Sequence, residues 1–309
     1  MNKIEEWKKL FLQHLYANNY SESARINYNS AVKIYLKYLS ANNIKDDKIF
    51  EYKTAFGFKQ YLSEYINART GQKLTDSSMQ NIMSNIKKFH CWLIKNSFIF
   101  VNPFDALESF KSSKIRLKRS IPLEDVYKIL AQPDLKKNTG FRDRTMLEVF
   151  FSTGIRRAEL QKLNIYDIDF TNGLLKVQGK GAKDRIVPIG STALSFLRNY
   201  IDKIRPQFLK ADSGEVLFLS SYGPGLNLAT IGVYTKKYIK ESGVKQKYSC
   251  HSFRHTCAVE MLKGNANIKH IQEMLGHSKI TTTQVYTNIL PVDLKKVHLR
   301  THPSNWIFI

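Results

Sequence analysis

Residues 251–286 read HSFRHTCAVEMLKGNANIKHIQEMLGHSKITTTQVY, and this stretch decides how the second half of the chain is interpreted. Its apolar residues recur at helical spacing in two segments, which predicts helices over 252–263 and 268–275. Gly264 and Gly276 stand just past these helices, where a left-handed C-terminal cap favours glycine. We therefore expect two short helices, each ended by a glycine.

The remainder of the second half mixes helices with one hairpin. Alternating apolar residues over 174–180 and 185–189, joined by a turn that holds Gly181 and Asp184, predict two antiparallel strands. Helical patterns cover residues 123–131, 142–152, 192–204 and 228–240.

The first half of the chain reads as four helices. The fourth is the clearest, because apolar residues recur at spacings of three and four from Met79 to Leu93. Ser21 is placed to cap the second helix, and the other two are expected over 4–17 and 54–68. Four helices in about 100 residues make a small bundle.

Residues 112–121 separate the two halves. The segment is rich in Lys and Arg, shows no helical stripe and leads to Pro122, which signals a helix start. We expect a helical domain over 1–111, a linker over 112–121 and a second, mixed domain over 122–309. The predicted fold class is mostly α with a small antiparallel β-sheet, in two domains.

The charge of the chain points to a polyanionic partner. Lys and Arg number 48 against 26 Asp and Glu, a net charge of +22, and the pI is near 9.8. Nucleic acid is the default partner at such a charge. A solvated basic surface and an anionic membrane surface are the alternatives, but no lipidation signal or basic amphipathic anchor supports the membrane.

Composition bounds the class of protein. Hydrophobic residues make up 43% and charged residues 24%, which excludes a wholly disordered or collagen-like chain. No apolar run reaches the ~18 residues of a membrane span, and the first nine residues show no secretory signal. Cys91, Cys250 and Cys257 are too few and scattered for a disulfide framework, so we expect a cytoplasmic protein.

Two arginines and a histidine have the chemistry to hold a phosphate. Arg156 and Arg254 carry planar guanidinium groups that match phosphate oxygens. His251 lies three residues before Arg254 at a predicted helix start, so the two share a face. For each of these three residues a structural role is the more common alternative to phosphate binding. For Arg156 that role is a surface ion pair with Glu159.

A lysine, a second histidine and a tyrosine complete the set. Lys180 lies at the predicted hairpin tip, where a solvated turn lysine is the commoner role and Lys183 is an alternative. Tyr286 follows His277 by nine residues, and a tyrosine, with a free pKa of ~10, becomes a nucleophile only beside cations. Together the set suits attack by a tyrosine on a phosphodiester, with the arginines stabilising a pentacoordinate transition state.

We expect no metal and no cofactor. The sequence shows no cluster of carboxylates of the kind that holds the two metal ions of a nuclease. Cys250, His251, His255 and Cys257 lie on one predicted helix and cannot surround an ion tetrahedrally without a second element.

The chain resembles the tyrosine recombinases of the phage-integrase and bacterial Xer type. The resemblance rests on residues 251–286, on TGIRRAEL at 153–160 and on VQGKGAKDRIVPI at 177–189. The first half resembles the family's core-binding domain, a SAM-like four-helix bundle, in architecture rather than in motif. Phe253 and the run 257–260 depart from the Xer pattern, which weakens assignment to the chromosome-dimer-resolving subgroup.

This resemblance implies a role for each residue of the set. Tyr286 would be the nucleophile, forming a 3′-phosphotyrosyl link, while Lys180 would protonate the leaving 5′-hydroxyl and His251 would do acid/base work. Arg156 and Arg254 would clamp the scissile phosphate, and His277 would donate a hydrogen bond to it. Glu159 would support Arg156.

The resemblance also implies partners. They are double-stranded DNA carrying a site with inverted arms, and a homotetramer that exchanges strands through a Holliday junction, with a paralogous recombinase as an alternative protomer. Trp306 and Phe308 are expected to dock on a neighbouring protomer. The competing functions are a type IB topoisomerase and a catalytically silent DNA-binding accessory protein.

Overall fold

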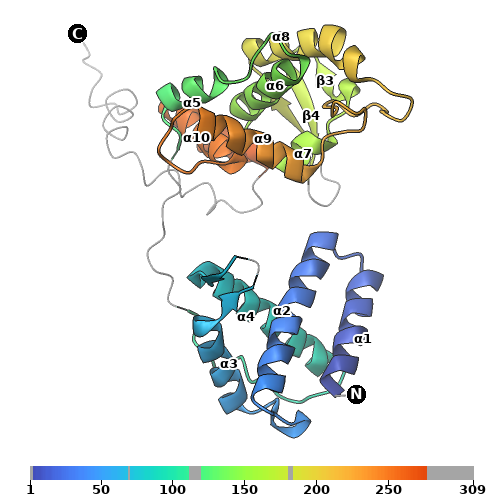
Figure 1. Ribbon diagram of the computed structural model, residues 1–309, viewed down its shortest axis with the longest axis vertical. Helices are drawn as coiled ribbons and strands as arrows, with labels where there is room; N and C mark the ends of the chain where they lie inside the picture. The colour runs from blue at the N-terminus through green and yellow to red at the C-terminus, as the bar shows by residue number, and fades with distance from the viewer. Residues whose placement is uncertain (1–2, 69, 111–119, 180–183, 277–309) are drawn as a thin grey trace, which may run out of the picture. The chain divides into compact units, whose positions relative to one another are not determined.

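The computed structural model describes residues 3–68, 70–110, 120–179 and 184–276. The chain divides into two compact units between Arg116 and Leu117, and each unit has its own buried core (Figure 1). The fold is mostly helical with two small antiparallel sheets, which confirms the predicted fold class. Among the described residues, no helix combines the length and the apolarity needed to cross a membrane.

The first unit is a four-helix bundle. Its helices are α1 (Lys3–Ala17), α2 (Glu22–Ala41), α3 (Tyr52–Glu64) and α4 (Asp76–Lys95), with a short 3-10 turn at Asp46–Lys48. The Oγ of Ser21 accepts a hydrogen bond from the backbone N–H of Ala24, which confirms the predicted cap. The predicted extension of the third helix to residue 68 is wrong, because a two-stranded hairpin, β1 (Ile66–Asn67) and β2 (Gln72–Lys73), follows α3.

Aromatic rings fill the core of the first unit. Tyr35 of α2 and Phe58 of α3 are fully buried and meet edge to face, with ring planes at 69° and ring centroids 4.8 Å apart. His90 of α4 is also fully buried, and its ring lies 4.7 Å from that of Phe104. Such ring pairs add specific geometry to the burial of large apolar surface.

The second unit surrounds a three-stranded antiparallel sheet with helices. Its strands, in spatial order, are β3 (Ile168–Asp169), β4 (Leu174–Gln178) and β5 (Asp184–Pro188). Its α-helices are α5 (Leu123–Leu130), α6 (Asn138–Thr153), α7 (Arg157–Lys162), α8 (Ser191–Asn199), α9 (Leu228–Glu241), α10 (Cys250–Lys263) and α11 (Ile268–Leu275). Strands β4 and β5 confirm the predicted hairpin, and Leu175 pairs with Val187 in it.

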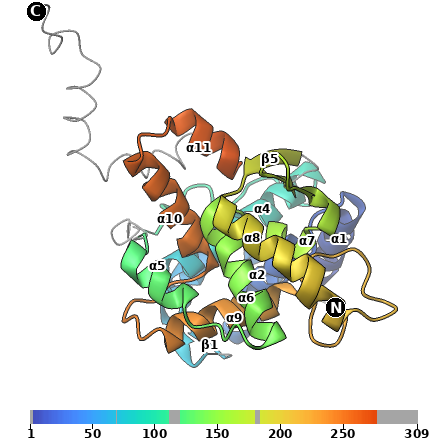
Figure 2. The same cartoon turned by 90° about the horizontal axis from the view of Figure 1, so that it is seen from above.

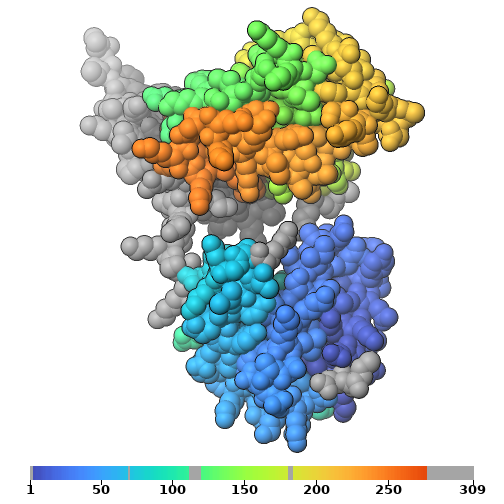
Figure 3. All heavy atoms as spheres, viewed as in Figure 1, coloured from blue at the N-terminus to red at the C-terminus, as the bar shows by residue number. Residues whose placement is uncertain are grey.

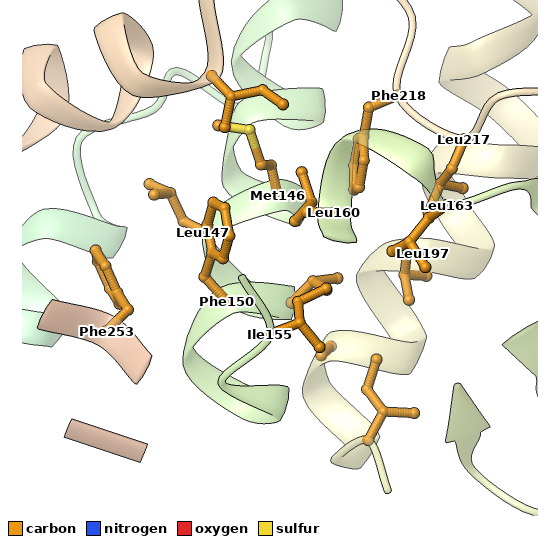
Figure 4. Packing of buried hydrophobic residues seen from close by; sticks show 14 of the residues in the cluster. Met146, Leu147, Phe150, Ile155, Leu160, Leu163, Leu197, Leu217, Phe218 and Phe253 are labelled. Carbon is orange, nitrogen blue, oxygen red and sulfur yellow. The ribbon is translucent and has the colours of Figure 1, made fainter. Parts of the chain in front are cut away.

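Helix α6 is the centre of the second core. Met146, Leu147 and Phe150 are fully buried, and they pack with Ile155 and Phe253 among the side chains of the cluster (Figure 4). The helix contacts α5, α8 and α10, so it is covered on several sides. A helix placed in this way provides a fixed end from which the chain continues toward Arg156.

Two helix ends differ from the sequence expectation. Gly264 has a φ of −76°, and Asn265 instead takes the left-handed conformation with a φ of 62°. Asparagine tolerates this conformation because its short side chain bonds locally. Gly276 has the predicted left-handed φ of 64°.

The helix predicted over 192–204 is α8 followed by a π-helical turn, Tyr200–Ile204.

Candidate active site

Arg254 is buried between the ends of two helices. Only 4% of the residue is exposed, and it projects from α10. Its Nη1 donates to the carbonyl oxygen of Gly154 at 2.8 Å, and its Nη2 donates to that of Leu275 at 2.5 Å. Carbonyls at helix ends lack intrahelical partners and carry partial negative charge, so they compensate a buried cation. Arg254 therefore holds the end of α6 against the end of α11.

Arg156 lies at the start of α7 and stays partly open to solvent, with 36% of its side chain exposed. Its backbone N–H and its Nη1 both donate to the carboxylate of Glu159, each at 2.7 Å. Its Nη2 donates to the carbonyl oxygen of Gly276 at 3.0 Å. The ion pair with Glu159, which is the alternative role of Arg156, is thus present. It leaves part of the Arg156 side chain accessible to an anion.

A third arginine, Arg185 of β5, completes the cluster and was missed by the sequence reasoning. Its Nη1 and Nη2 donate to the two oxygens of Glu159, each at 2.9 Å, and its Nε donates to the carbonyl oxygen of Met274 at 2.7 Å. The signal that marks it is strand alternation, because Arg185 lies on the same face of β5 as the buried Val187. A charged side chain on the buried face of a strand is expected to be paired with a group of opposite charge or with hydrogen-bond acceptors.

Glu159 binds both Arg156 and Arg185. The residue is 5% exposed, and burial alone would raise the pKa of its carboxyl. Hydrogen bonds from Arg185 and from the backbone and side chain of Arg156 outweigh burial and lower this pKa to about 2. Glu159 is therefore ionised at neutral pH and fixes two guanidinium groups.

Three consecutive residues at the end of α11 accept from the three arginines. They are Met274, Leu275 and Gly276. Helix α11 also contacts β5, and the two elements lie next to each other in Figure 2. The C-terminal end of a helix attracts cations because its dipole is negative there. The arrangement fixes the position of Gly276, the last residue of this unit that the structure describes.

His251 is exposed in the first turn of α10 and faces a basic cleft. The cleft has a volume of about 390 Å³, and its lining includes His251, Arg156, Arg157 and Lys236. Arg157 lies against Gly232 of α9, where a side-chain carbon would collide with the guanidinium. In Figure 3 the orange residues of α9 and α10 form a continuous part of the surface of this unit. The sequence reasoning assigned no binding role to Arg157, although it lies in the run 153–160, or to Lys236, which lies in none of the motifs quoted above.

The structure thus brings Arg156 and His251 to one cleft, and Arg254 and Arg156 to one helix end. Lys180, His277 and Tyr286 lie outside the described residues. By chain order, Lys180 belongs to the connection between β4 and β5.

The thiols considered as metal ligands have other partners. The Sγ of Cys250 donates to the hydroxyl of Thr235 at 3.2 Å, and the Sγ of Cys257 lies 3.7 Å from the carbonyl oxygen of Ser152. Burial raises the pKa of Cys257 to about 12, so its thiol is protonated at neutral pH. Within the described residues, no group of three or more His, Cys, Asp or Glu is arranged around a common point for a metal ion.

Comparison with known proteins identifies the family. The phage integrase family model matches residues 119–291. Tyrosine recombinase XerD of Staphylococcus epidermidis is 34% identical over 245 residues, which cover 79% of this chain and 83% of that protein.

Solved structures share the fold at lower identity. The XerH site-specific recombinase bound to a palindromic difH substrate, in a post-cleavage complex, has a TM-score of 0.74 at 20% identity and covers 92% of this chain and 81% of that chain. A lambda integrase tetramer bound to a Holliday junction has a TM-score of 0.68 at 21% identity, with 91% and 76% covered. The family match over more than half of the sequence and the curated relative at 34% identity establish that this chain belongs to the phage integrase family, the tyrosine recombinases, which cleave and rejoin DNA strands.

Proposed function

We propose that this chain is a site-specific recombinase that cuts DNA at a site with two inverted arms and holds the cut strand on Tyr286. The observation that carries the proposal is the convergence of Arg156 and Arg254 on the end of α11. His277 is the next residue along the chain, and Tyr286 follows in the same segment. Two guanidinium groups are thereby fixed at Leu275 and Gly276, which precede His277 in the sequence.

The chemistry is a transesterification at one phosphate. The phenolic oxygen of Tyr286 attacks the phosphorus, the bond to the 5′-oxygen breaks, and a 3′-phosphotyrosyl link forms. His251, in the basic cleft beside Arg156, takes the phenol proton, and Lys180 gives a proton to the leaving 5′-oxygen. The reverse steps rejoin the strand, so neither a nucleotide nor a metal ion is consumed.

Charge stabilisation by the arginines supplies most of the rate. Arg156 offers a partly exposed guanidinium to the non-bridging oxygens. Arg254 carries a buried guanidinium whose orientation two carbonyl bonds fix in advance. Preorganised donors of this kind act on the charge that develops in the transition state. His277 adds a further hydrogen bond to the phosphate.

The assembly we propose is a homotetramer on two duplexes, with a paralogous recombinase as an alternative protomer. The relation to a lambda integrase tetramer on a Holliday junction supports it, and the net charge of +22 suits a polyanionic partner. Residues 1–111 would bind DNA, 112–121 would link the domains, and 122–309 would catalyse. Trp306 and Phe308 would dock on a neighbouring protomer, and the protein would act in the cytoplasm.

The experiment is to recover DNA that is covalently bound to the protein. The full chain is expressed in a bacterial host, denatured without proteolysis and purified, and the attached DNA is sequenced. A shared sequence with two inverted arms is expected. Attachment at scattered sequences would indicate a topoisomerase, and DNA binding without any attachment would indicate an accessory protein.

A further inference from the structure

We propose that Arg185 is a positioning residue of the cleavage reaction, which fixes the Arg156 guanidinium and keeps its charge available to the DNA phosphate. The inference rests on the proposed function, because it takes Arg156 to hold that phosphate. Arg185 would touch neither the DNA nor the reacting atoms. It would act through Glu159 and through the end of α11.

The first support is the sharing of Glu159. Its Oε1 accepts from the Nη1 atoms of both Arg156 and Arg185, at 2.7 and 2.9 Å. Its Oε2 accepts from the backbone N–H of Arg156 and from the Nη2 of Arg185, at 2.7 and 2.9 Å. Both oxygens are therefore used by both arginines. A change in the orientation of the carboxylate moves Arg156 as well.

The second support is the charge of this cluster. A pair made of Arg156 and Glu159 alone is neutral, and a buried carboxylate beside the phosphate site repels an incoming anion. Arg185 adds a second positive charge to the same carboxylate, with a side chain only 13% exposed. The three side chains together carry a net charge of +1. Arg185 thus offsets Glu159 and leaves the charge of Arg156 to the phosphate.

The third support is the contact with Gly276. A Cβ on Gly276 would lie 3.2 Å from the Cδ, Nε and Nη1 of Arg185, and the residue has a φ of 64°. Glycine thus lets the arginine pack closely against the residue whose carbonyl accepts from Arg156. Arg185 also binds the carbonyl of Met274. It therefore supports Arg156 at both of its anchors, Glu159 and the end of α11.

The test compares two substrates in a single-turnover assay. One carries the site recovered by covalent trapping with its natural phosphate, and the other carries a methylphosphonate at the scissile position, which removes one negative charge. The variants are Arg185→Met, Arg185→Lys and the control Arg205→Met. Arg205 is also a buried arginine, and it donates to the carbonyls of Gly214 and Val216, outside this cluster. Covalent product, DNA affinity and thermal stability are measured for each protein.

With the natural phosphate, Arg185→Met is expected to slow cleavage about 100-fold, as small misplacements of a catalytic group do. Its DNA affinity should change little. With the methylphosphonate the loss in cleavage rate should shrink to about tenfold or less, because the negative charge that Arg156 would stabilise is absent. Arg185→Lys should show an intermediate loss, since lysine lacks the fork that spans both oxygens of Glu159. Arg205→Met should lose stability and show the same small loss on both substrates.

Equal losses on the two substrates for Arg185→Met, matching those of Arg205→Met, would show a purely structural role and overturn the inference while the proposed function stands. A wild-type chain that forms no covalent product on either substrate would overturn the proposed function and this inference with it. A double variant with Glu159→Gln gives a second check. If Arg185 acts through Glu159, the double variant loses about as much as the stronger single variant.

Discussion

Arg254 of α10 donates its Nη2 to the carbonyl oxygen of Leu275 at 2.5 Å while its Nη1 binds the end of α6. A single side chain therefore joins two helix ends, and one of them leads directly into the segment that carries Tyr286. In the proposed mechanism the guanidinium that gives this structural support would also bind the phosphate. Substitutions at Arg254 should therefore affect folding and cleavage to different and measurable extents.

Arg254→Ala is expected to lower cleavage far more than DNA binding. The proposed contact with the phosphate would strengthen in the transition state, so its removal should cost about 10²–10³-fold in rate. The loss of a buried donor pair costs about 1–3 kcal/mol of stability. Single-turnover cleavage and half-site binding, measured below the unfolding temperature, separate the two effects. Binding and cleavage that fall in parallel would contradict the assignment.

Glu159→Gln should change the acid stability of the second unit. The carboxyl pKa falls from 4.5 unfolded to about 2 folded, so the folded state favours the ionised form. This contribution, about 3 kcal/mol, is present above pH 4.5 and is lost as the pH falls toward 2. The variant should be less stable at pH 7 and should lose less stability on acidification than the wild type.

The control for this variant is Glu148→Gln. Glu148 is another buried carboxylate, paired with Arg144 within α6. It should cost stability without changing the cleavage rate of the folded protein, whereas Glu159→Gln should lower that rate by releasing Arg156. Unchanged cleavage in both variants would contradict the role given to Glu159.

Gly154→Ala should weaken the contact between α6 and α11. The residue has a φ of 61°, and a Cβ there would lie 2.8 Å from the Cδ2 of Leu275 and 3.3 Å from the Sγ of Cys257. Left-handed strain and the displaced neighbours together should cost about 1–3 kcal/mol. Cleavage should fall with stability because Arg254 binds the carbonyl of this residue. Chemical denaturation measures the stability and a cleavage assay measures the rate. A variant as stable as the wild type would show that the ends of α6 and α11 adjust to the added Cβ without cost.

The first unit should lose stability in mild acid through His90. Burial lowers the pKa of its imidazole to about 4 although the carbonyl of Ile86 accepts from it. Among the described residues, its Nε2 has no hydrogen-bond partner. The folded state favours the neutral ring, so stability is full above pH 6.5 and falls by about 3 kcal/mol as the pH drops to 4.

Tryptophan fluorescence measures this effect. Trp7 and Trp92 lie in the first unit, and a Trp306→Phe background leaves only these two tryptophans in the chain. His90→Phe in that background should keep most of the stability at pH 7 and lose the dependence between pH 6.5 and 4. The same pH dependence in both proteins would show that another group is responsible.

Much of the fold follows from local sequence signals. The periodic run from Met79 to Leu93 lies in α4, and the alternation around Leu175 and Val187 forms the β4–β5 hairpin. The hairpin at 66–73 escaped prediction because strands of two residues have no measurable period. The left-handed residue after α10 is Asn265 and not Gly264. Both residue types tolerate that conformation, so the sequence does not say which of the two adopts it.

The candidate site was predictable by residue type but not by contact. Arg156, His251 and Arg254 were assigned roles from motif and spacing. Arg185 lies in the quoted run 177–189 but was assigned none, because strand residues take their partners from elements far apart in sequence. Its partners Glu159 and Met274 lie 26 and 89 residues away. Local patterns do not encode such separations. Tertiary packing alone brings the three arginines to one helix end.

Identification of the residue that carries the DNA tests the central claim most directly. The covalent complex is trapped, the DNA is trimmed to a short oligonucleotide, and the protein is digested and examined by mass spectrometry. Tyr248→Phe is the matched control, since Tyr248 is a buried tyrosine whose hydroxyl donates to Gln246. The account predicts an adduct on the peptide that contains Tyr286, absent from Tyr286→Phe and retained in Tyr248→Phe. An adduct that persists in Tyr286→Phe, on any other residue, would contradict it.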